Sequence, residues 1–489
     1  MSSATDYDVL IVGAGISGID AAYRIQEQCP ELSYRLVEAR DQLGGTWDLF
    51  RYPGIRSDSD FFTLSFPFHP WRGKDSIVDG DEILDYLHEV VETHGIDKHI
   101  SYRTRIIAAD WNSEDARWIV QAEVDGQPEQ LVVRFIVGCT GYYDYEEPYD
   151  AQLPGRERFK GQLVHPQFWP EDLDPNGKTF AVIGSGATAV TLVPSLVKLG
   201  AHVTMVQRTP TYILAEPRQD PVADLLRSKL PAGRAHQIMR MKNTALQWGL
   251  FQVCRRAPKM MRNVLRKGAI SGTGSEALVD THFNPPYDPW DQRLCIAPGG
   301  DLFTAIKDGG AEIVTGSIRT ITEDGIELTD GTKVSADIIV TATGLAMCML
   351  GKVQLSVDGT PVNPSETVVF RGTMLSGVPN FAMCVGYINL SWTMRADMTA
   401  RLVSRILKRL SADDRSVVVP VYTGERPDSP FLDMQSGYLR RGAPLMPRAA
   451  KEYPWTMAQN VIRDAWHTNR ADLDDGLVWT GERQKVTAG

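Results

Sequence analysis

Cysteine is scarce in this sequence, and the cysteines present do not form the pairs that a metal site or a disulfide framework needs. Six occur in 489 residues, and none has the CxxC spacing of a zinc ribbon. They are Cys29, Cys139, Cys254, Cys295, Cys348 and Cys384. We therefore predict reduced thiols, as in a cytoplasmic protein, and no metal site.

Long hydrophobic runs and an excess of positive charge are also missing. No uninterrupted apolar stretch approaches the roughly 18 residues that a membrane span requires, and MSSATDYD leads directly into VLIVG without a basic leader. The net charge of −10 argues against attraction of the whole chain to nucleic acid. The sequence thus predicts a cytoplasmic protein that is neither secreted nor membrane-spanning and that has no nucleic-acid partner.

What the sequence does contain is a strand–glycine–helix pattern near its start. The apolar run VLIV is followed at once by GAGISG, then by the helix-forming IDAAYRIQEQ and a second strand that ends at Glu38. Such a pattern needs Gly13 for a tight turn, Gly15 for close approach to a pyrophosphate and Gly18 for helix–strand packing, while Glu38 bonds the ribose hydroxyls. The alternative is an ordinary glycine turn, and the spacing favours a dinucleotide site.

A second copy of the pattern lies at residues 180–208. FAVIGSGATAV supplies Gly184, Gly186 and Ala189, and the position where an acid is expected carries Gln207 followed by Arg208. An acid there would repel the 2′-phosphate of NADP, whereas a guanidinium pairs with it. We predict an NADPH site with Arg208, assisted by Thr209, on the phosphate; a solvated surface arginine is the alternative.

The two copies together predict an α/β fold with two dinucleotide-binding, Rossmann-like domains, the first for FAD and the second for NADPH. A nicotinamide delivers hydride, and a flavin accepts it and can react with dioxygen. Flavin disulfide reductases share this arrangement, but they need a redox cysteine pair where this chain has LGGTWDLFRYPGIRSDSD. That class of enzyme is therefore almost excluded.

A polar and aromatic connector, FKGQLVHPQFWP, lies between the two glycine motifs. Its prolines and glycine argue against a long helix, and it matches the pattern F-x-G-x-x-x-H-x-x-x-W-P at Phe159, Gly161, His165, Trp169 and Pro170. In this order of motifs the chain resembles the type I Baeyer–Villiger monooxygenases, a group of class B flavoprotein monooxygenases. The segments LFRYPGIRSDSD and NPPYDPWDQRLC are most similar to the subgroup of mycobacterial ethionamide-activating monooxygenases.

The resemblance implies a reaction and two catalytic residues. It implies that NADPH and O2 serve to insert one oxygen atom beside a ketone carbonyl through a C4a-peroxyflavin, giving an ester or lactone, and that sulfides or thioamides are also oxidised. By resemblance Arg293 lies beside the peroxide and Asp58 orients it; an arginine suits this role because it stays protonated. A structural arginine and a helix-capping aspartate are the alternatives. Many family members carry lysine where this chain has Gln292.

Further flavin contacts follow from the matched motifs. The resemblance assigns them to Gly45, Thr46, Trp47, Arg51, Tyr52, Gly386 and Asn389. It also implies that the fingerprint around His165 couples domain motion to the state of the cofactors, rather than doing chemistry. Thr140, Gly141, Thr343 and Gly344 are expected at the hinges between domains, and Trp392 either borders the substrate or packs in the core.

The predicted organisation is a discontinuous FAD domain of residues 1–145 and 346–489 around an NADP domain of residues 146–345. Within the NADP domain, residues 218–290 read as a helical insertion with a glycine-rich loop at GTGSEALVD. Twelve Lys or Arg lie between Arg218 and Lys267, opposed by Asp220 and Asp224. Two interpretations stay open: a solvated helical cap, which is favoured, or an amphipathic basic face in peripheral contact with a membrane.

Two other functions stay open beside the leading one. A flavin-containing monooxygenase acting mainly on nitrogen or sulfur would use a protonated, electrophilic peroxide, and a non-catalytic nucleotide-binding protein would sense redox state. The fingerprint and Arg293 favour the ketone oxygenase. The sequence leaves the physiological ketone or sulfide substrate and the oligomeric state open.

Overall fold

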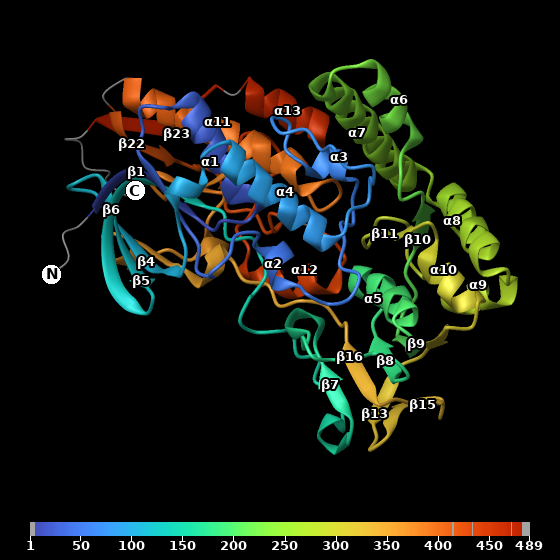
Figure 1. Ribbon diagram of the computed structural model, residues 1–489. Helices are drawn as coiled ribbons and strands as arrows, with labels where there is room; N and C mark the ends of the chain where they lie inside the picture. Colours follow the sequence, from blue (N-terminus) through green and yellow to red (C-terminus); the bar gives the residue numbers. More distant parts are fainter. Residues whose placement is uncertain (1–4, 413–414, 433, 471, 482–489) are drawn as a thin grey trace.

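The computed structural model describes residues 5–412, 415–432, 434–470 and 472–481 (Figure 1). Within these residues the two largest sheets are a mixed sheet with a parallel centre and a smaller, parallel sheet. The larger sheet has the order β18-β17-β4-β5-β6-β1-β2-β3, and β21 pairs with β6. Its strands are β1 (Thr5–Val12), β2 (Tyr34–Val37), β3 (Ile100–Ser101), β4 (Thr104–Asn112), β5 (Arg117–Val124), β6 (Gln127–Gly138), β17 (Gln354–Val357), β18 (Thr360–Pro361) and β21 (Phe381–Met383).

The core of the first domain forms where β1 is buried on both faces. Val9, Leu10 and Ile11 have no exposed surface, and β1 pairs in parallel with β2 and β6, as expected for an apolar run in a parallel sheet. Helix α1 (Ile16–Gln28) follows the first glycine motif, and it packs against the long C-terminal helix α11 (Trp392–Ala412). The first and last parts of the chain therefore share one core.

Other elements of the first domain cover this core. They are α2 (Thr46–Leu49), α3 (Phe61–Leu64), α4 (Gly80–Thr93), β19 (Val369–Phe370), β20 (Met374–Leu375), β22 (Arg415–Pro420), α12 (Gly437–Gly442), α13 (Val461–Asn469) and β23 (Leu477–Gly481).

The smaller sheet has the order β12-β9-β8-β16-β7. Its strands are β12 (Ala311–Thr315), β9 (His202–Gln207), β8 (Thr179–Ile183), β16 (Ile338–Thr341) and β7 (Gln162–Val164), with α5 (Ala187–Lys198) after the second glycine motif. Nearby lie β10 (Ile213–Glu216), β11 (Cys295–Pro298), α10 (Asp301–Lys307), β13 (Ile318–Ile321), β14 (Gly325–Leu328) and β15 (Lys333–Ser335). The predicted fold class, two Rossmann-like units with the first one discontinuous, is confirmed; the boundaries at 145 and 345 stay predictions.

The two connections between the sheets run side by side. The backbone N–H of Asp144 donates to the carbonyl of Ala346 at 3.0 Å, and the N–H of Cys348 donates to the carbonyl of Tyr142 at 2.9 Å. Gly141 and Gly344 adopt positive φ angles of 67° and 108°, which other residues rarely adopt. Backbone hydrogen bonds therefore hold the two connections together.

The helical insertion consists of α6 (Pro221–Lys229), α7 (Ala232–Arg256), α8 (Pro258–Thr273) and α9 (Glu276–His282), on the outer side of the molecule (Figure 1). The predicted glycine-rich loop at GTGSEALVD is wrong in extent, because only Gly274 and Ser275 lie between helices: Gly274 ends α8 with φ 74° and the Ser275 hydroxyl caps α9. No helix of the described residues is long and apolar enough to span a bilayer.

Helix α7 is attached to the first domain by buried polar contacts. Arg240 donates to the backbone carbonyls of Phe62, Thr63 and Ser65. The carboxylate of Asp60 accepts hydrogen bonds from the amides of Asn243 and Gln247. The insertion therefore bridges the two domains.

Candidate functional site

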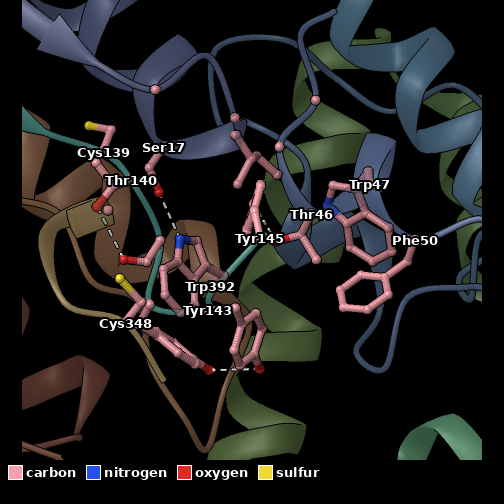
Figure 2. A pocket seen from close by; sticks show the side chains of 18 of the residues that line it. Ser17, Thr46, Trp47, Phe50, Cys139, Thr140, Tyr143, Tyr145, Cys348 and Trp392 are labelled. Carbon is pink, nitrogen blue, oxygen red and sulfur yellow. Dashed lines mark hydrogen bonds between the residues drawn. The ribbon is translucent and has the colours of Figure 1, made fainter. Parts of the chain in front are cut away.

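A cavity of about 390 Å³ opens at the carboxyl ends of β1, β2 and β6 and reaches helix α5 of the second domain. Parallel α/β sheets bind their ligands at this edge. Nine of the residues predicted from sequence line it: Gly13, Gly15, Glu38, Gly45, Thr46, Trp47, Tyr52, Asp58 and Arg293. Figure 2 shows part of the lining, with Thr46 and Trp47 on one side and Tyr143 and Trp392 on another.

The first glycine motif has the close contacts that its sequence requires. Gly13 has φ 104°, and a Cβ there would lie 2.6 Å from the carbonyl oxygen of Cys139; a Cβ at Gly18 would lie 1.8 Å from the carbonyl oxygen of Gly13. Gly15 is the N-cap of α1, and no side chain accepts the first N–H groups of the helix. Free N–H groups at a helix start suit a pyrophosphate.

Glu38 follows β2 and lines the same cavity. Its carboxylate accepts the backbone N–H of Ala14 at 2.8 Å and that of Arg40 at 3.0 Å. Burial raises the pKa of Glu38, and these two hydrogen bonds oppose that rise. The side chain is thus held firmly where a ribose attached to the pyrophosphate would lie.

The GGTWDLFRY segment continues the cavity wall, with one correction. Gly45 has φ 57°, the Thr46 hydroxyl lies 3.2 Å from that of Tyr145, and burial raises the pKa of Tyr52 to about 12. Arg51, predicted to wall the flavin, does not line the cavity: its guanidinium pairs with Asp48, and its Nε donates to the Asp48 carbonyl at 3.0 Å. The carboxylate of Asp48 attracts Arg51 away from the cavity.

Arg293 and Asp58 meet inside the cavity. Arg293 Nη2 lies 3.0 Å from Asp58 Oδ2, and Arg293 Nη1 donates to the carbonyl of Ile388 at 3.4 Å. The side chain of Arg293 is 24% exposed, compared with 48% for Asp58. Burial is the largest influence and opposes the cation, but Asp58 together with Tyr438, Tyr142 and Tyr143 outweighs it and raises the pKa of Arg293. A permanent, oriented cation therefore borders the cavity.

Three phenols surround this ion pair, and the sequence analysis assigned them no role in the site. Tyr143 donates to the hydroxyl of Tyr142 at 3.3 Å, and the ring centroid of Tyr438 lies 6.2 Å from that of Tyr143. Burial raises the pKa of all three hydroxyls. Tyr142 and Tyr143 directly follow the predicted hinge residues Thr140 and Gly141, whereas Tyr438 lies 145 residues from Arg293 and has no motif around it.

The segment near the C-terminus contributes through Trp392. This residue lines the cavity and donates its indole N–H to the Ser17 hydroxyl at 2.7 Å (Figure 2). Gly386 and Asn389, predicted beside the flavin, lie outside the lining: Gly386 packs on the Trp392 ring, and the amide of Asn389 donates to the carbonyl of Gln459 at 2.8 Å. Trp392 therefore lines the cavity and also packs against the core of the first domain, and its contact with a substrate stays a prediction.

The two glycines of the second motif lie outside this cavity, although Ala187 and Thr188 of the same motif line it. A Cβ at Gly184 would lie 2.2 Å from the carbonyl oxygen of Ala342, whereas one at Gly186 would meet nothing within 4 Å. Ala189 is fully buried in the core of the second domain. An open start of α5 above a tight turn is the shape that a second pyrophosphate needs.

The side chains of Arg208 and Gln207 point in different directions at the end of β9. Arg208 is exposed, and the adjacent Thr209 carbonyl accepts the Ser185 hydroxyl at 2.9 Å. Gln207 points inward instead, with its amide donating to the carbonyl of His282 and to the Thr315 hydroxyl. The Arg208 side chain is therefore exposed at the end of β9, whereas Gln207 is turned into the second domain; contact of Arg208 and Thr209 with a 2′-phosphate stays a prediction.

The FKGQLVHPQFWP fingerprint connects both interdomain linkers. It contains the short strand β7 and a 3-10 turn (Pro166–Phe168), so the connector has more structure than its sequence predicted. The Gln167 amide donates to the carbonyl of Asp144 at 2.7 Å, and His165 Nδ1 accepts the Gln167 N–H at 3.2 Å. Burial lowers the pKa of His165, while the Gly344 backbone opposes that shift.

The other fingerprint residues pack against the second domain and hold the connector in place. Gly161 is required because a Cβ would lie 2.2 Å from the carbonyl oxygen of Asp337. Phe159 and Trp169 pack against clusters of the second domain, and the Pro170 carbonyl accepts the Leu173 N–H at 3.3 Å. None of the five lines the cavity.

Comparisons with known proteins agree with this geometry. Residues 6–226 match the model of the flavin-binding monooxygenase-like family. The chain is 46% identical to the FAD-containing monooxygenase EthA of Mycolicibacterium smegmatis, over 99% of both chains, and 44% identical to that of Mycobacterium tuberculosis H37Rv, over 96% of both. The chain belongs to the flavin-binding monooxygenase-like family.

Solved structures of two monooxygenases share the fold of this chain. An open structure of cyclohexanone monooxygenase matches with a TM-score of 0.76 and 19% identity, covering 97% of this chain and 100% of that one. An oxidized steroid monooxygenase bound to NADP matches with a TM-score of 0.75 and 20% identity, over 97% and 100%. Family membership confirms the prediction of a flavin monooxygenase, and the identity to EthA confirms the predicted subgroup.

Proposed function

We propose that this protein is an NADPH- and O2-dependent, FAD-containing Baeyer–Villiger monooxygenase. It converts ketones into esters or lactones and also oxidises sulfides or thioamides. The observation that carries the proposal is the Arg293–Asp58 ion pair at the cavity, 3.0 Å between charged atoms. Relatives described as FAD-containing monooxygenases and a solved structure with FAD and NADP support both cofactors.

The residues present fit the two cofactors. We assign the FAD pyrophosphate to the start of α1 at Gly13 and Gly15, and its ribose to Glu38, because the helix N–H groups lack side-chain caps. We assign NADPH to Gly184 and Gly186 with its 2′-phosphate on Arg208. When bound, NADPH supplies hydride to the flavin, and the reduced flavin activates dioxygen.

Arg293 provides a charge that does not change with pH. Its pKa is raised further by Asp58, so it is positive whenever the enzyme works, and it stabilises negative charge that develops on the carbonyl oxygen of the ketone. Asp58 fixes the direction of the guanidinium. Because Asp58 is half-exposed, the pair can turn as the domains move.

The phenols of Tyr142 and Tyr143 complete the polar end of the cavity. Burial raises the pKa of each, so both keep their protons, and Tyr143 donates to Tyr142 at 3.3 Å. The Tyr142 hydroxyl is also hydrogen-bonded to Tyr438, and it is the phenol that we assign as a donor to the ketone oxygen. Together with Arg293 this gives the carbonyl oxygen two kinds of donor.

The fingerprint has a mechanical role in this proposal. Gln167 holds the first linker through Asp144, and His165 lies against the second linker at Gly344. Rotation of the NADP domain, proposed as residues 146–345, therefore moves both linkers together. His165 takes no part in proton transfer.

One experiment tests the function. Purified protein is mixed with NADPH, a long-chain methyl ketone and ¹⁸O2, and the products are analysed by mass spectrometry. One labelled ester oxygen is expected, and Arg293→Ala should abolish the ester while flavin reduction by NADPH continues; Arg319→Ala, an exposed arginine of the second domain, is the matched control. Hydrogen peroxide as the sole product would contradict the proposal.

An oxygenase that acts on nitrogen or sulfur is the second candidate, because membership of the family does not specify a ketone as the substrate. A sulfide offered under the same conditions separates the two: sulfoxide formed without any ester from the tested ketones would favour it. NADPH that is not consumed in air by yellow, flavin-containing protein would instead favour a non-catalytic redox sensor.

A further inference from the structure

The outer surface of the helical insertion is apolar where a soluble helix is ordinarily polar. Eight of the sixteen large hydrophobic side chains exposed among the described residues lie between Val222 and Val264. On α7, Met241 is 65% exposed and Leu246 is 62% exposed, and Ile238 and Val253 are exposed beside them. Nothing within the described chain covers this face.

Positive charge accompanies these side chains. Arg234, Ile238, Met241, Ala245 and Arg256 recur at intervals of three, four or eleven residues, which places them on one stripe of α7. Both arginines are exposed, and among the described residues neither has an ion-pair partner. The stripe therefore has an apolar centre with a cation toward each end.

Helix α8 repeats the arrangement. Met260 and Val264 are exposed one turn apart. Lys267 follows Val264 on the same face and Lys259 precedes Met260 at the start of the helix, again without an ion-pair partner in the described parts of the chain. Residues 221–273 contain one acidic side chain, Asp224, although the whole chain carries a net charge of −10. The two helices thus form a basic and apolar patch on an acidic protein.

The inner face of α7 leads toward the cavity. Trp248 packs against Tyr387 and Leu390, and both of those residues line the cavity. Leu250 packs against Leu294, the residue after Arg293. Helix α7 therefore lies between the exposed patch and the wall of the proposed active site.

We propose that the α7–α8 patch, defined by Ile238, Met241, Leu246, Val253, Met260 and Val264 with their flanking cations, binds the surface of an anionic lipid bilayer. Exposed apolar side chains enter the interface between headgroups and acyl chains, and the cations pair with acidic headgroups. A second copy of the chain fits less well, because two such patches would bring like charges together. The inference concerns binding and goes beyond the oxygenation reaction.

Vesicle flotation tests the inference without any turnover. Purified flavoprotein is floated with vesicles of phosphatidylcholine alone or with added phosphatidylglycerol. We expect binding about tenfold or more tighter to the anionic vesicles, and loss of that binding at high salt, where charge is screened. Protein that stays in solution with both kinds of vesicle, or that binds both equally, would overturn the proposal.

Paired variants test each half of the patch. Met241→Ser with Leu246→Ser, and separately Lys259→Glu with Lys267→Glu, should each weaken binding about tenfold or more. Ile462→Ser with Trp466→Ser is the matched control, because these side chains of α13 are 61% and 58% exposed outside the patch; it should bind as the parent does. Thermal melting verifies that all variants fold. Patch variants that bind normally, or that instead dissolve an oligomer seen by gel filtration, would reject a bilayer as the occupant.

Discussion

Gly386 lies directly against the indole ring of Trp392: a Cβ on this glycine would fall 2.3 Å from Trp392 Cδ2. The indole N–H in turn donates to the Ser17 hydroxyl at 2.7 Å, in the first turn of α1. The glycine therefore acts on the cavity through the tryptophan, since Trp392 lines the cavity and Gly386 does not.

Gly386→Ala should displace the Trp392 ring. We expect the free energy of unfolding to fall by about 1–3 kcal/mol, as in other overpacked sites, and the purified protein to retain less flavin. Denaturant titration and flavin absorbance measure the two effects. Gly233→Ala is the control, because a Cβ there meets nothing within 4 Å; equal stability of the two variants would contradict the packing argument.

Asp58→Asn should impair oxygenation while leaving flavin reduction intact. The amide keeps the size of the side chain but removes the charge that orients Arg293, and hydrogen bonds to charged groups contribute about 1.5–3 kcal/mol. We expect ester formation to fall about tenfold to a hundredfold, with more hydrogen peroxide released per NADPH oxidised. Asp41→Asn, at an exposed loop position, should behave as the parent does. An unchanged ratio of ester to peroxide would remove Asp58 from the site.

Local motifs predicted much of this molecule, because they report contacts close in sequence. Gly18 is required by its contact with Gly13 in the same strand–turn–helix unit, so the fold class could be predicted from the motif. Arg51 lies outside the cavity because Asp48 pairs with its guanidinium. A motif in the sequence does not show which neighbouring side chain an arginine will pair with.

The residues that the sequence missed come together only through the tertiary fold. Tyr438 belongs to α12, yet it lies beside Tyr143 at the first linker. The attachment of α7 to α3 through Asp60 and Arg240 joins segments that are 180 residues apart. Contacts of this range depend on how the two domains pack, and a single sequence does not record that packing.

Arg208→Ala should weaken NADPH binding selectively. Loss of a charge-assisted contact to the 2′-phosphate costs about 1.5–3 kcal/mol, so the KM for NADPH should rise about tenfold to a hundredfold while that for NADH stays the same. Stopped-flow flavin reduction with each nucleotide gives both values. Arg319→Ala is the matched control, and an equal rise for NADH would show that Arg208 does not contact the phosphate.

Tyr142→Phe should lower the oxygenation rate without changing NADPH consumption. The variant keeps the ring that packs 5.2 Å from that of Trp392 and removes one donor, and a lost neutral hydrogen bond of about 0.5–1.5 kcal/mol corresponds to a fall of about twofold to tenfold. Tyr34→Phe, a phenol of the first domain outside the cavity, is the control. An undiminished ester yield would mean that the carbonyl oxygen is held elsewhere.

Acid should loosen the attachment of α7 through His236. This buried residue lies 3.3 Å from the Phe66 carbonyl, and its pKa is lowered from 6.5 to about 4 because burial disfavours the cation and Arg240 repels it. Between pH 6.5 and about 4, His236 is protonated in the unfolded chain but stays neutral in the folded protein. The contribution of His236 to the free energy of unfolding is therefore fully present above pH 6.5, and it is lost as the pH drops toward 4.

The contribution of this one histidine can be isolated by substitution. A fall of about two and a half in pKa corresponds to about 3 kcal/mol by pH 4, and His236→Gln should remove it, so that the variant loses less stability than the parent between pH 6.5 and 4. Urea titrations across this range measure the slope. His202→Gln, at an exposed position, should keep the slope of the parent, because its side chain is solvated in both states. If the free energy of unfolding has the same pH dependence in the parent and in His236→Gln, the charged imidazole is tolerated in the contact between α7 and the first domain.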